Sequence, residues 1–225
     1  MKNLFSIALA LYSFGTMAQE SVFSKLDPKD IPAGLEYHAN QPPVGDPQQF
    51  KGKRIAILAA HGVQESELVF PYEFLKARGA TIDIVSPAWT DGRVVMVQYL
   101  KPIQWVNSTE SFQSAALRNY DLMVLTGGAW NSTVVRSDTD ALILIRNHFA
   151  KGKALAAICS GAQILIDSGI AKDRNLTGTH SVKVDLINAG ATYLDKPVVV
   201  DDQLITSRNP DDLIPFVEAI AEILN

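Results

Sequence analysis

From about residue 52 onward, short continuous apolar runs alternate with longer stretches whose apolar residues recur at helical spacing. The apolar runs predict strands buried on both faces, because a half-buried strand would alternate apolar and polar residues. The clearest of these predicted strands cover residues 54–59, 81–86, 122–125 and 154–158. Shorter strands are expected at 198–200 and 204–206, and the segment 94–106 is strand-like but irregular.

The stretches between these runs predict helices. The first reaches Arg78 and stops at Gly79; because Pro71 lies inside it, its regular part is expected to begin near Pro71 or to be kinked. A second helix is expected over 138–150, before Gly152. The last carries one apolar stripe formed by Leu213, Phe216, Val217, Ile220 and Leu224. Strands that alternate with helices predict an α/β fold, with a doubly wound, mostly parallel sheet sandwiched by helices over residues 52–225.

The N-terminal pattern is different. Lys2 precedes an uncharged, mostly apolar run that ends in Thr16-Met17-Ala18, which resembles a small-residue cleavage site. Residues 1–18 are therefore predicted to be a secretory signal peptide, and a periplasmic or secreted protein follows. The alternative is an uncleaved anchor, but the run is shorter than the ~20 residues that span a membrane. Residues 19–51, rich in proline and glutamine, are predicted to be an extended arm or linker.

Charge and composition limit the kinds of partner and cofactor that the chain is expected to bind. The formal net charge is −4, and it becomes one unit more negative once Lys2 is removed, so nucleic-acid binding and, after cleavage, membrane binding are not expected. With a single cysteine, no intramolecular disulfide can form. Metal-ligand clusters, phosphate loops and dinucleotide fingerprints are not apparent, so no metal and no cofactor are predicted. Asn107, Asn131 and Asn175 begin glycosylation-type triplets.

The single cysteine, Cys159, stands where the strand 154–158 gives way to the small residues Ser160-Gly161-Ala162. This order is typical of a nucleophile elbow, a tight strand-to-helix turn that exposes its central side chain. The N–H groups of the following helix are expected to lower the thiol pKa and to hold an oxyanion. Without its flanking pattern, a lone cysteine is more often a small buried hydrophobic residue.

Two other features also fall at the carboxyl ends of predicted strands: the loop after Ala59 and the Gly127-Gly128 turn. Ligands of open α/β sheets bind at this edge. The coincidence of both with Cys159 predicts one site there.

Several ordered motifs resemble the ThiJ/PfpI superfamily, which includes the parkinsonism-associated deglycase and the PfpI-type proteases. They are Ile55-Ala56-Ile57-Leu58 with Glu67 and Pro71 downstream, Leu125-Thr126-Gly127-Gly128, Ala157-Ile158-Cys159-Ser160-Gly161, Ile187-Asn188-Ala189-Gly190-Ala191 and Thr206-Ser207-Arg208-Asn209-Pro210. The resemblance covers most of residues 53–225 and implies a flavodoxin-like fold and a homodimer with the cysteine near the subunit interface.

The resemblance also implies roles for particular residues. Glu67 matches the glutamate that hydrogen-bonds the cysteine sulfur, although an acidic residue is also favoured near any helix N-terminus. Gly127 and Gly128 match the turn that lines the oxyanion pocket, and the Ser160 N–H is expected to assist there. Ser160 also departs from the PfpI pattern, because it occupies the place of the histidine that follows the cysteine in those enzymes.

Other histidines could replace that missing imidazole. His180 lies one residue beyond the position where the deglycase subgroup has a histidine, and His61 lies in the loop after the first strand. His180 is the stronger candidate for a catalytic role, and His61 is a substrate-binding candidate. The elbow also fits class I glutamine amidotransferases, but they need a His-x-Glu pair, and Ser181-Val182 follow His180. Glutamine hydrolysis is therefore rejected.

The leading prediction is an exported, cysteine-dependent enzyme that acts on a small reactive carbonyl or amide compound. Glyoxalase III or deglycase chemistry is one version, and a hydrolase or hydratase is the other; proteolysis is disfavoured by Ser160. Cys159 would be the nucleophile, assisted by Glu67. The alternative is a non-enzymatic redox-sensing or chaperone-like protein that responds through oxidation of Cys159. A binding module with an inert elbow is the weakest hypothesis.

Overall fold

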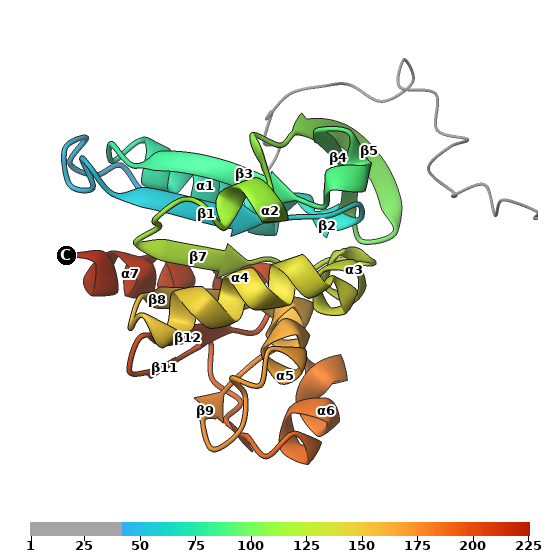
Figure 1. The fold of residues 1–225 in the computed structure, drawn as a ribbon. Coiled ribbons are helices and arrows are strands. Elements are labelled where there is room, and N and C mark those ends of the chain that lie inside the picture. Colours follow the sequence, from blue (N-terminus) through green and yellow to red (C-terminus); the bar gives the residue numbers. More distant parts are fainter. Residues whose placement is uncertain (1–41) are drawn as a thin grey trace, which may run out of the picture.

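The computed structural model describes residues 42–225, and its centre is a seven-stranded sheet in the order β11-β12-β8-β7-β1-β3-β6 (Figure 1). All neighbouring strands are parallel except β11 and β12, which are antiparallel. The strands are β1 (Arg54–Leu58), β3 (Thr81–Ser86), β6 (Glu110–Ser111), β7 (Leu122–Leu125), β8 (Ala154–Ile158), β11 (Val198–Asp201) and β12 (Leu204–Ser207). The predicted α/β fold with a mostly parallel sheet is confirmed.

The two faces of the sheet build two separate cores, because successive side chains of a strand point in opposite directions. Ile55 and Ile57 of β1 pack on one face, and Ala56 and Leu58 pack on the other. Both faces are covered, so the central strands are apolar throughout, as the continuous runs in the sequence indicated.

Helices α1 (Glu65–Lys76) and α7 (Leu213–Leu224) cover the first face, behind the sheet in Figure 1. The predicted stripe of α7 is buried as expected. Helices α2 (Phe112–Ala115), α3 (Asn131–Ser137) and α4 (Thr139–Ala150) lie on the opposite side. Helix α4 begins after Asp138, whose side chain accepts the N–H groups of Asp140 and Ala141.

The irregular segment 94–106 forms a hairpin in a second, three-stranded sheet. Its strands are β2 (Val63–Gln64), β4 (Arg93–Gln98) and β5 (Lys101–Asn107), in the order β2-β4-β5. Tyr99 and Leu100 form the turn between β4 and β5. Beyond the elbow lie α5 (Ile164–Asp167), β9 (Asn175–Leu176), α6 (Lys183–Asn188) and β10 (Thr192–Tyr193).

Two sequence expectations need correction. Helix α1 begins at Glu65 and continues through Pro71. The sequence had suggested that its regular part begins near Pro71. Packing also begins before residue 52: Phe50 is fully buried in the core, and Arg78 Nη2 donates to the Pro43 carbonyl at 2.8 Å. The composition of residues 42–51 is typical of a linker, but these contacts show that the residues belong to the domain.

The predicted signal peptide, residues 1–18, and most of the predicted arm lie outside the described residues. Within residues 42–225, no helix is long and apolar enough to cross a membrane.

Candidate functional site

A cavity of about 290 Å³ opens at the carboxyl end of the sheet, where β1, β7 and β8 end. Its wall combines the elbow, the start of α1, the turn after β7, the β4–β5 hairpin tip and the loop around residue 180. The lining residues are Gln64, Glu67, Tyr99, Leu100, Gly128, Ala129, Cys159, Ser160, Thr179, Ser181 and Pro210. The structure therefore brings Cys159, Glu67, Gly128 and Ser160 together, as the sequence predicted.

Cys159 has the geometry of an elbow. It follows β8 directly, its φ is 59°, and a 3-10 helix over Cys159–Gln163 begins with it. A left-handed backbone is unusual for a residue other than glycine, and such strain gathers at functional sites. Small neighbours are required because a side chain on Gly161 would collide with the backbone carbonyls of Leu125 and Thr126.

Glu67, on the first turn of α1, lies at the inner end of the cavity and is completely buried. Its Oε2 accepts the Gly127 N–H at 2.7 Å, and its carboxyl group interacts with the Cys159 side chain. Its Oε1 is buried and has no other hydrogen-bond partner among the described residues. A Cβ on Gly127 would lie 2.7 Å from Glu67 Oε2 and 2.9 Å from Cys159 Cβ, so only glycine fits between the two groups.

Burial decides where the proton of this pair resides. Burial raises the pKa of Glu67 to about 8. This effect outweighs that of the hydrogen bonds from Cys159 and Gly127, which lower the pKa. The carboxyl group therefore keeps its proton at neutral pH. Oε2 accepts the Gly127 N–H, whereas the buried Oε1 has no hydrogen-bond partner among the described residues, which is consistent with a protonated carboxyl group.

The thiol responds differently from what the elbow alone predicted. Burial raises the pKa of Cys159, a negative charge on Glu67 and the hydrogen bond to its carboxyl group raise it further, and hydrogen bonds from Ser160 lower it. The helical segment after the cysteine is short, so its dipole opposes burial only weakly. The effect of the Glu67 charge disappears while that carboxyl is protonated. Cys159 is therefore a thiol at neutral pH in the free protein, and the Ser160 hydrogen bonds rather than a helix dipole favour its ionised form.

Ser160 joins the elbow to the Gly127-Gly128 turn. Its Oγ accepts the Gly128 N–H at 3.2 Å, donates to the Gly128 carbonyl at 3.2 Å and accepts from Ser132 Oγ at 3.0 Å. The N–H groups of Gly127 and Gly128, expected in the oxyanion pocket, are both engaged in this structure. The Ser160 N–H, which points at the sulfur, is the donor best placed for an oxyanion.

Neither candidate histidine lines this cavity. His180 begins a short 3-10 helix, and its neighbours Thr179 and Ser181 supply the cavity wall instead. His61 is buried between Trp89 and Trp105, and its Nδ1 accepts the Val95 N–H at 3.1 Å. Burial lowers the pKa of His61 to about 4, so it is neutral and supports the second sheet.

Asn131 is a residue that the sequence marked only as a glycosylation triplet. It is fully buried, its Nδ2 donates to the carbonyls of Thr126 (2.6 Å) and Gly127 (3.1 Å), and its Oδ1 accepts the Ala60 N–H at 2.6 Å. It therefore ties the end of β1 to the turn that holds Glu67. Its burial excludes glycosylation of the folded chain at this position.

Replacing Asn131 with alanine should lower the free energy of unfolding by about 3 kcal/mol, because buried backbone groups lose their partners. For a domain of this size, that corresponds to a fall in Tm of about 10 °C, measurable by thermal denaturation. Asn107→Ala, at an exposed residue that also begins a triplet, is the control and should leave Tm nearly unchanged. A similar Tm for both variants would contradict the role given to Asn131.

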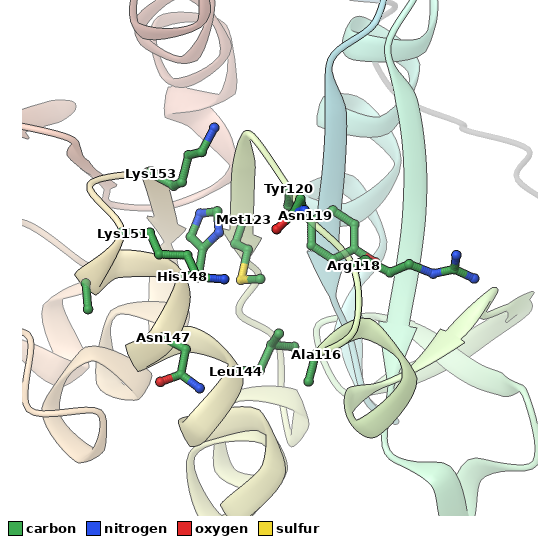
Figure 2. Close-up of a pocket in the computed structure, with 11 residues that line it drawn as sticks. Ala116, Arg118, Asn119, Tyr120, Met123, Leu144, Asn147, His148, Lys151 and Lys153 are labelled. Atoms are coloured by element: carbon green, nitrogen blue, oxygen red, sulfur yellow. The ribbon is translucent and has the colours of Figure 1, made fainter.

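A second cavity, of about 340 Å³, lies at the opposite end of the sheet (Figure 2). Met123, Leu144 and His148 face it, and Arg118, Lys151 and Lys153 surround it. Arg118 is paired with Glu110 and Lys153 with Asp121, so its positive charge is mostly compensated. The amino ends of β7 and β8 lie beside this second cavity, and its wall contains no cysteine. This cavity is therefore not the site of the Cys159 chemistry.

Within residues 42–225, no group of three or more His, Cys, Asp or Glu side chains is placed to hold a metal ion.

Comparisons with known proteins identify the family of this domain. A sequence model of the DJ-1/PfpI family matches residues 53–223. Deglycase TK1284 of Thermococcus kodakarensis is 32% identical over 171 residues, which cover 76% of this chain and 99% of that protein. Protein/nucleic acid deglycase 2 of Escherichia coli is 36% identical over 166 residues, 73% of this chain and 93% of that protein.

Solved structures give the same result for the fold. DJ-1beta of Drosophila melanogaster superimposes with a TM-score of 0.70 at 28% identity, covering 76% of this chain and 90% of that one. DJ-1 of Schizosaccharomyces pombe gives a TM-score of 0.68 at 26% identity, with 75% and 90% covered.

Proposed function

The chain belongs to the DJ-1/PfpI family, and from this premise we propose that it is a cysteine-dependent enzyme that converts small reactive carbonyl compounds. The observation that carries the proposal is the pair formed by Cys159 and the fully buried Glu67 beside a small cavity. Relatives named deglycases favour carbonyl substrates over amides. The proposed reaction turns a 2-oxoaldehyde and water into a 2-hydroxy acid, so methylglyoxal would give lactate.

The first step forms a carbon–sulfur bond. The Cys159 thiolate attacks the aldehyde carbon, and the electrons of the C=O bond move to its oxygen. The Glu67 O–H supplies the proton that this oxygen takes, which gives a hemithioacetal and leaves Glu67 as a carboxylate. The Ser160 N–H, already directed at the sulfur, is placed to stabilise the developing oxyanion.

The later steps use the carboxylate that the first step creates. Glu67 removes the C–H proton of the former aldehyde carbon while the neighbouring ketone oxygen takes a proton from water, which gives an enediol. The hydroxide left by that water takes the hydroxyl proton of the sulfur-bearing carbon while Glu67 returns its proton to the second carbon, which gives a thioester. Water then cleaves the thioester to release the 2-hydroxy acid and the free thiol–carboxyl pair. Glu67 serves the proton transfers at both carbons and water serves those at the oxygens, so the absence of an imidazole from the cavity wall formed by the described residues is no obstacle.

The test measures lactate released from methylglyoxal by the wild type and by Cys159→Ala. Loss of the nucleophile should reduce turnover by at least about 1,000-fold, while circular dichroism shows an unchanged fold. Equal rates for the two proteins would refute the proposal.

The same preparations address redox sensing, which the pairing of the sulfur with a carboxyl O–H also favours, because such a donor stabilises a sulfinate. Mild peroxide followed by mass spectrometry would show a gain of about 32 Da on Cys159 for a sulfinic acid. Rapid oxidation without turnover of any carbonyl or amide compound would support sensing instead of catalysis.

Two further parts of the proposal rest on the sequence and the family resemblance. Export to the periplasm or outside the cell follows from the N-terminal pattern of Lys2 and the apolar run after it. A homodimer with a small-molecule substrate follows from the resemblance. Size-exclusion chromatography with light scattering tests the dimer, and N-terminal sequencing of exported protein tests cleavage after Ala18.

A further inference from the structure

The tip of the β4–β5 hairpin forms part of the Cys159 cavity. Tyr99 and Leu100 both line it, although 81% and 72% of their respective surfaces remain exposed to solvent. Exposing a large apolar side chain to water at the mouth of a cavity costs free energy. That cost is removed when an apolar group covers the side chain. Their exposure therefore needs a reason beyond the stability of the hairpin.

The backbone of this tip is strained in a way that favours a functional explanation. Tyr99 has φ 57°, a left-handed conformation that glycine or asparagine adopts at much lower cost. The hairpin is also irregular just before the tip, because Met96 pairs with Gln104 whereas Val97 pairs with Pro102. Bulges of this kind re-aim side chains near active sites, and strained residues gather there.

A specific tether fixes the tip over the catalytic pair. Gln64 Oε1 accepts the Tyr99 N–H at 3.1 Å, and the Gln64 N–H donates to the Gly127 carbonyl at 3.3 Å. Gln64 is also the N-cap residue of α1, the helix of Glu67. One residue thus couples the position of Tyr99 to both parts of the cavity that hold Glu67.

The remaining wall indicates what the tip can recognise. Ala129 and Pro210 add apolar surface, and Ser160, Thr179 and Ser181 add hydroxyl groups on other parts of the wall. Among the described residues that line the cavity, none carries a positive charge. An anionic substituent would therefore find no counter-ion in the wall, whereas an uncharged apolar or aromatic one would pack on Tyr99 and Leu100.

We propose that the Tyr99-Leu100 tip determines specificity by binding the apolar or aromatic substituent of an uncharged electrophile whose reactive carbon faces Cys159. For catalysis this inference rests on the proposed function, because it assigns the substrate class of the same site. The binding of the substituent itself does not depend on turnover, so it can be measured separately.

Alkylation of Cys159 gives that separate measurement, because it is the only thiol in the chain. Rate constants are measured for N-methylmaleimide, N-phenylmaleimide and N-(4-carboxyphenyl)maleimide, each divided by the rate for N-acetylcysteine. The phenyl reagent should exceed the methyl reagent by about tenfold, the advantage of one aromatic contact. The carboxyphenyl reagent should lose most of this advantage.

The double variant Tyr99→Asn/Leu100→Ser should reduce the phenyl-to-methyl ratio to within about twofold of the free thiol, because the aromatic contact is removed. Asparagine tolerates the left-handed conformation, so the hairpin keeps its turn. Leu117→Ser, at a residue that is 88% exposed and does not line the cavity, is the matched control and should keep the wild-type ratio. An unchanged ratio in the double variant would overturn the inference.

Turnover provides the second measurement. For phenylglyoxal relative to methylglyoxal, kcat/KM should fall by about tenfold in the double variant, while methylglyoxal is still converted. If the wild type converts neither compound, the proposed function fails, and the maleimide ratios still decide the role of the tip. If both compounds are converted with an unchanged preference in the double variant, the role of the tip fails and the proposed function stands.

Discussion

Glu67→Leu is expected to reduce carbonyl turnover by about 100-fold or more, in the range lost when a general acid–base group is removed. Leucine fills a similar volume at this buried position but can neither hydrogen-bond the Cys159 side chain nor exchange a proton with the substrate. Because Glu67 raises the pKa of Cys159 through its charge and its hydrogen bond, that pKa should not rise in the variant, and iodoacetamide alkylation at neutral pH should be at least as fast as in the wild type. Turnover should therefore fall while alkylation does not.

Glu67→Gln separates the two roles of the side chain. Glutamine can still donate a hydrogen bond to the sulfur, so alkylation at neutral pH should stay within a few fold of the wild-type rate. It cannot exchange a proton with substrate, so turnover should fall about as far as in Glu67→Leu. If Glu67→Gln kept full turnover, Glu67 would not be the acid–base group.

The pH dependence follows from the same carboxyl group. Its pKa is raised to about 8, so the protonated form predominates below that pH and is lost as the pH rises through it. Wild-type turnover should therefore decline above about pH 8. The residual turnover of Glu67→Gln should lack this decline, because its side chain does not titrate.

Gly127→Ala is expected to be the most damaging change of a single methyl group. The new Cβ would lie 2.7 Å from Glu67 Oε2, 2.9 Å from Cys159 Cβ and 2.9 Å from the Ser160 N, and these neighbours are held by the strained elbow. Turnover should fall at least about 100-fold, by displacement of the reacting groups, and the free energy of unfolding should fall by about 1–3 kcal/mol. Steady-state kinetics and thermal denaturation measure the two effects.

Gly169→Ala is the matched control for Gly127→Ala. Gly169 has φ 74°, and a methyl group added there would meet nothing within 4 Å, so alanine adds backbone strain without a collision. Its free energy of unfolding should fall by about 1 kcal/mol, while turnover remains at the wild-type level. If both variants lost activity equally, the close packing around Gly127 would not explain the effect.

Much of the fold could be predicted from the sequence because its signals are local. The continuous apolar runs at 122–125 and 154–158 correspond to β7 and β8, and the stripe from Leu213 to Leu224 corresponds to α7. Two boundaries were misjudged where distant contacts decide the outcome. Helix α1 runs through Pro71, and Phe50 joins the core from a segment whose composition indicated a linker.

Some parts of the candidate site could likewise be predicted from the sequence, and others could not. The elbow at Cys159 and the turn at Gly127-Gly128 could be located because each directly follows a strand, and the carboxyl ends of parallel strands meet at one edge. The contribution of Asn131 could not be found, because its hydrogen-bond partners come from two loops that only folding brings together. The Tyr99 tip was equally hidden, since the irregular segment gave no register.

The sequence by itself determined the α/β architecture, the position of Cys159 at an elbow and, through the family motifs, Glu67 as its partner. Only the tertiary structure decided that burial raises the pKa of Glu67, that neither His180 nor His61 lines the cavity and that Tyr99 does. The physical reason is that strand and turn preferences act between neighbours in the chain. Desolvation, hydrogen-bond partners and cavity walls depend on residues that the chain keeps far apart until it folds.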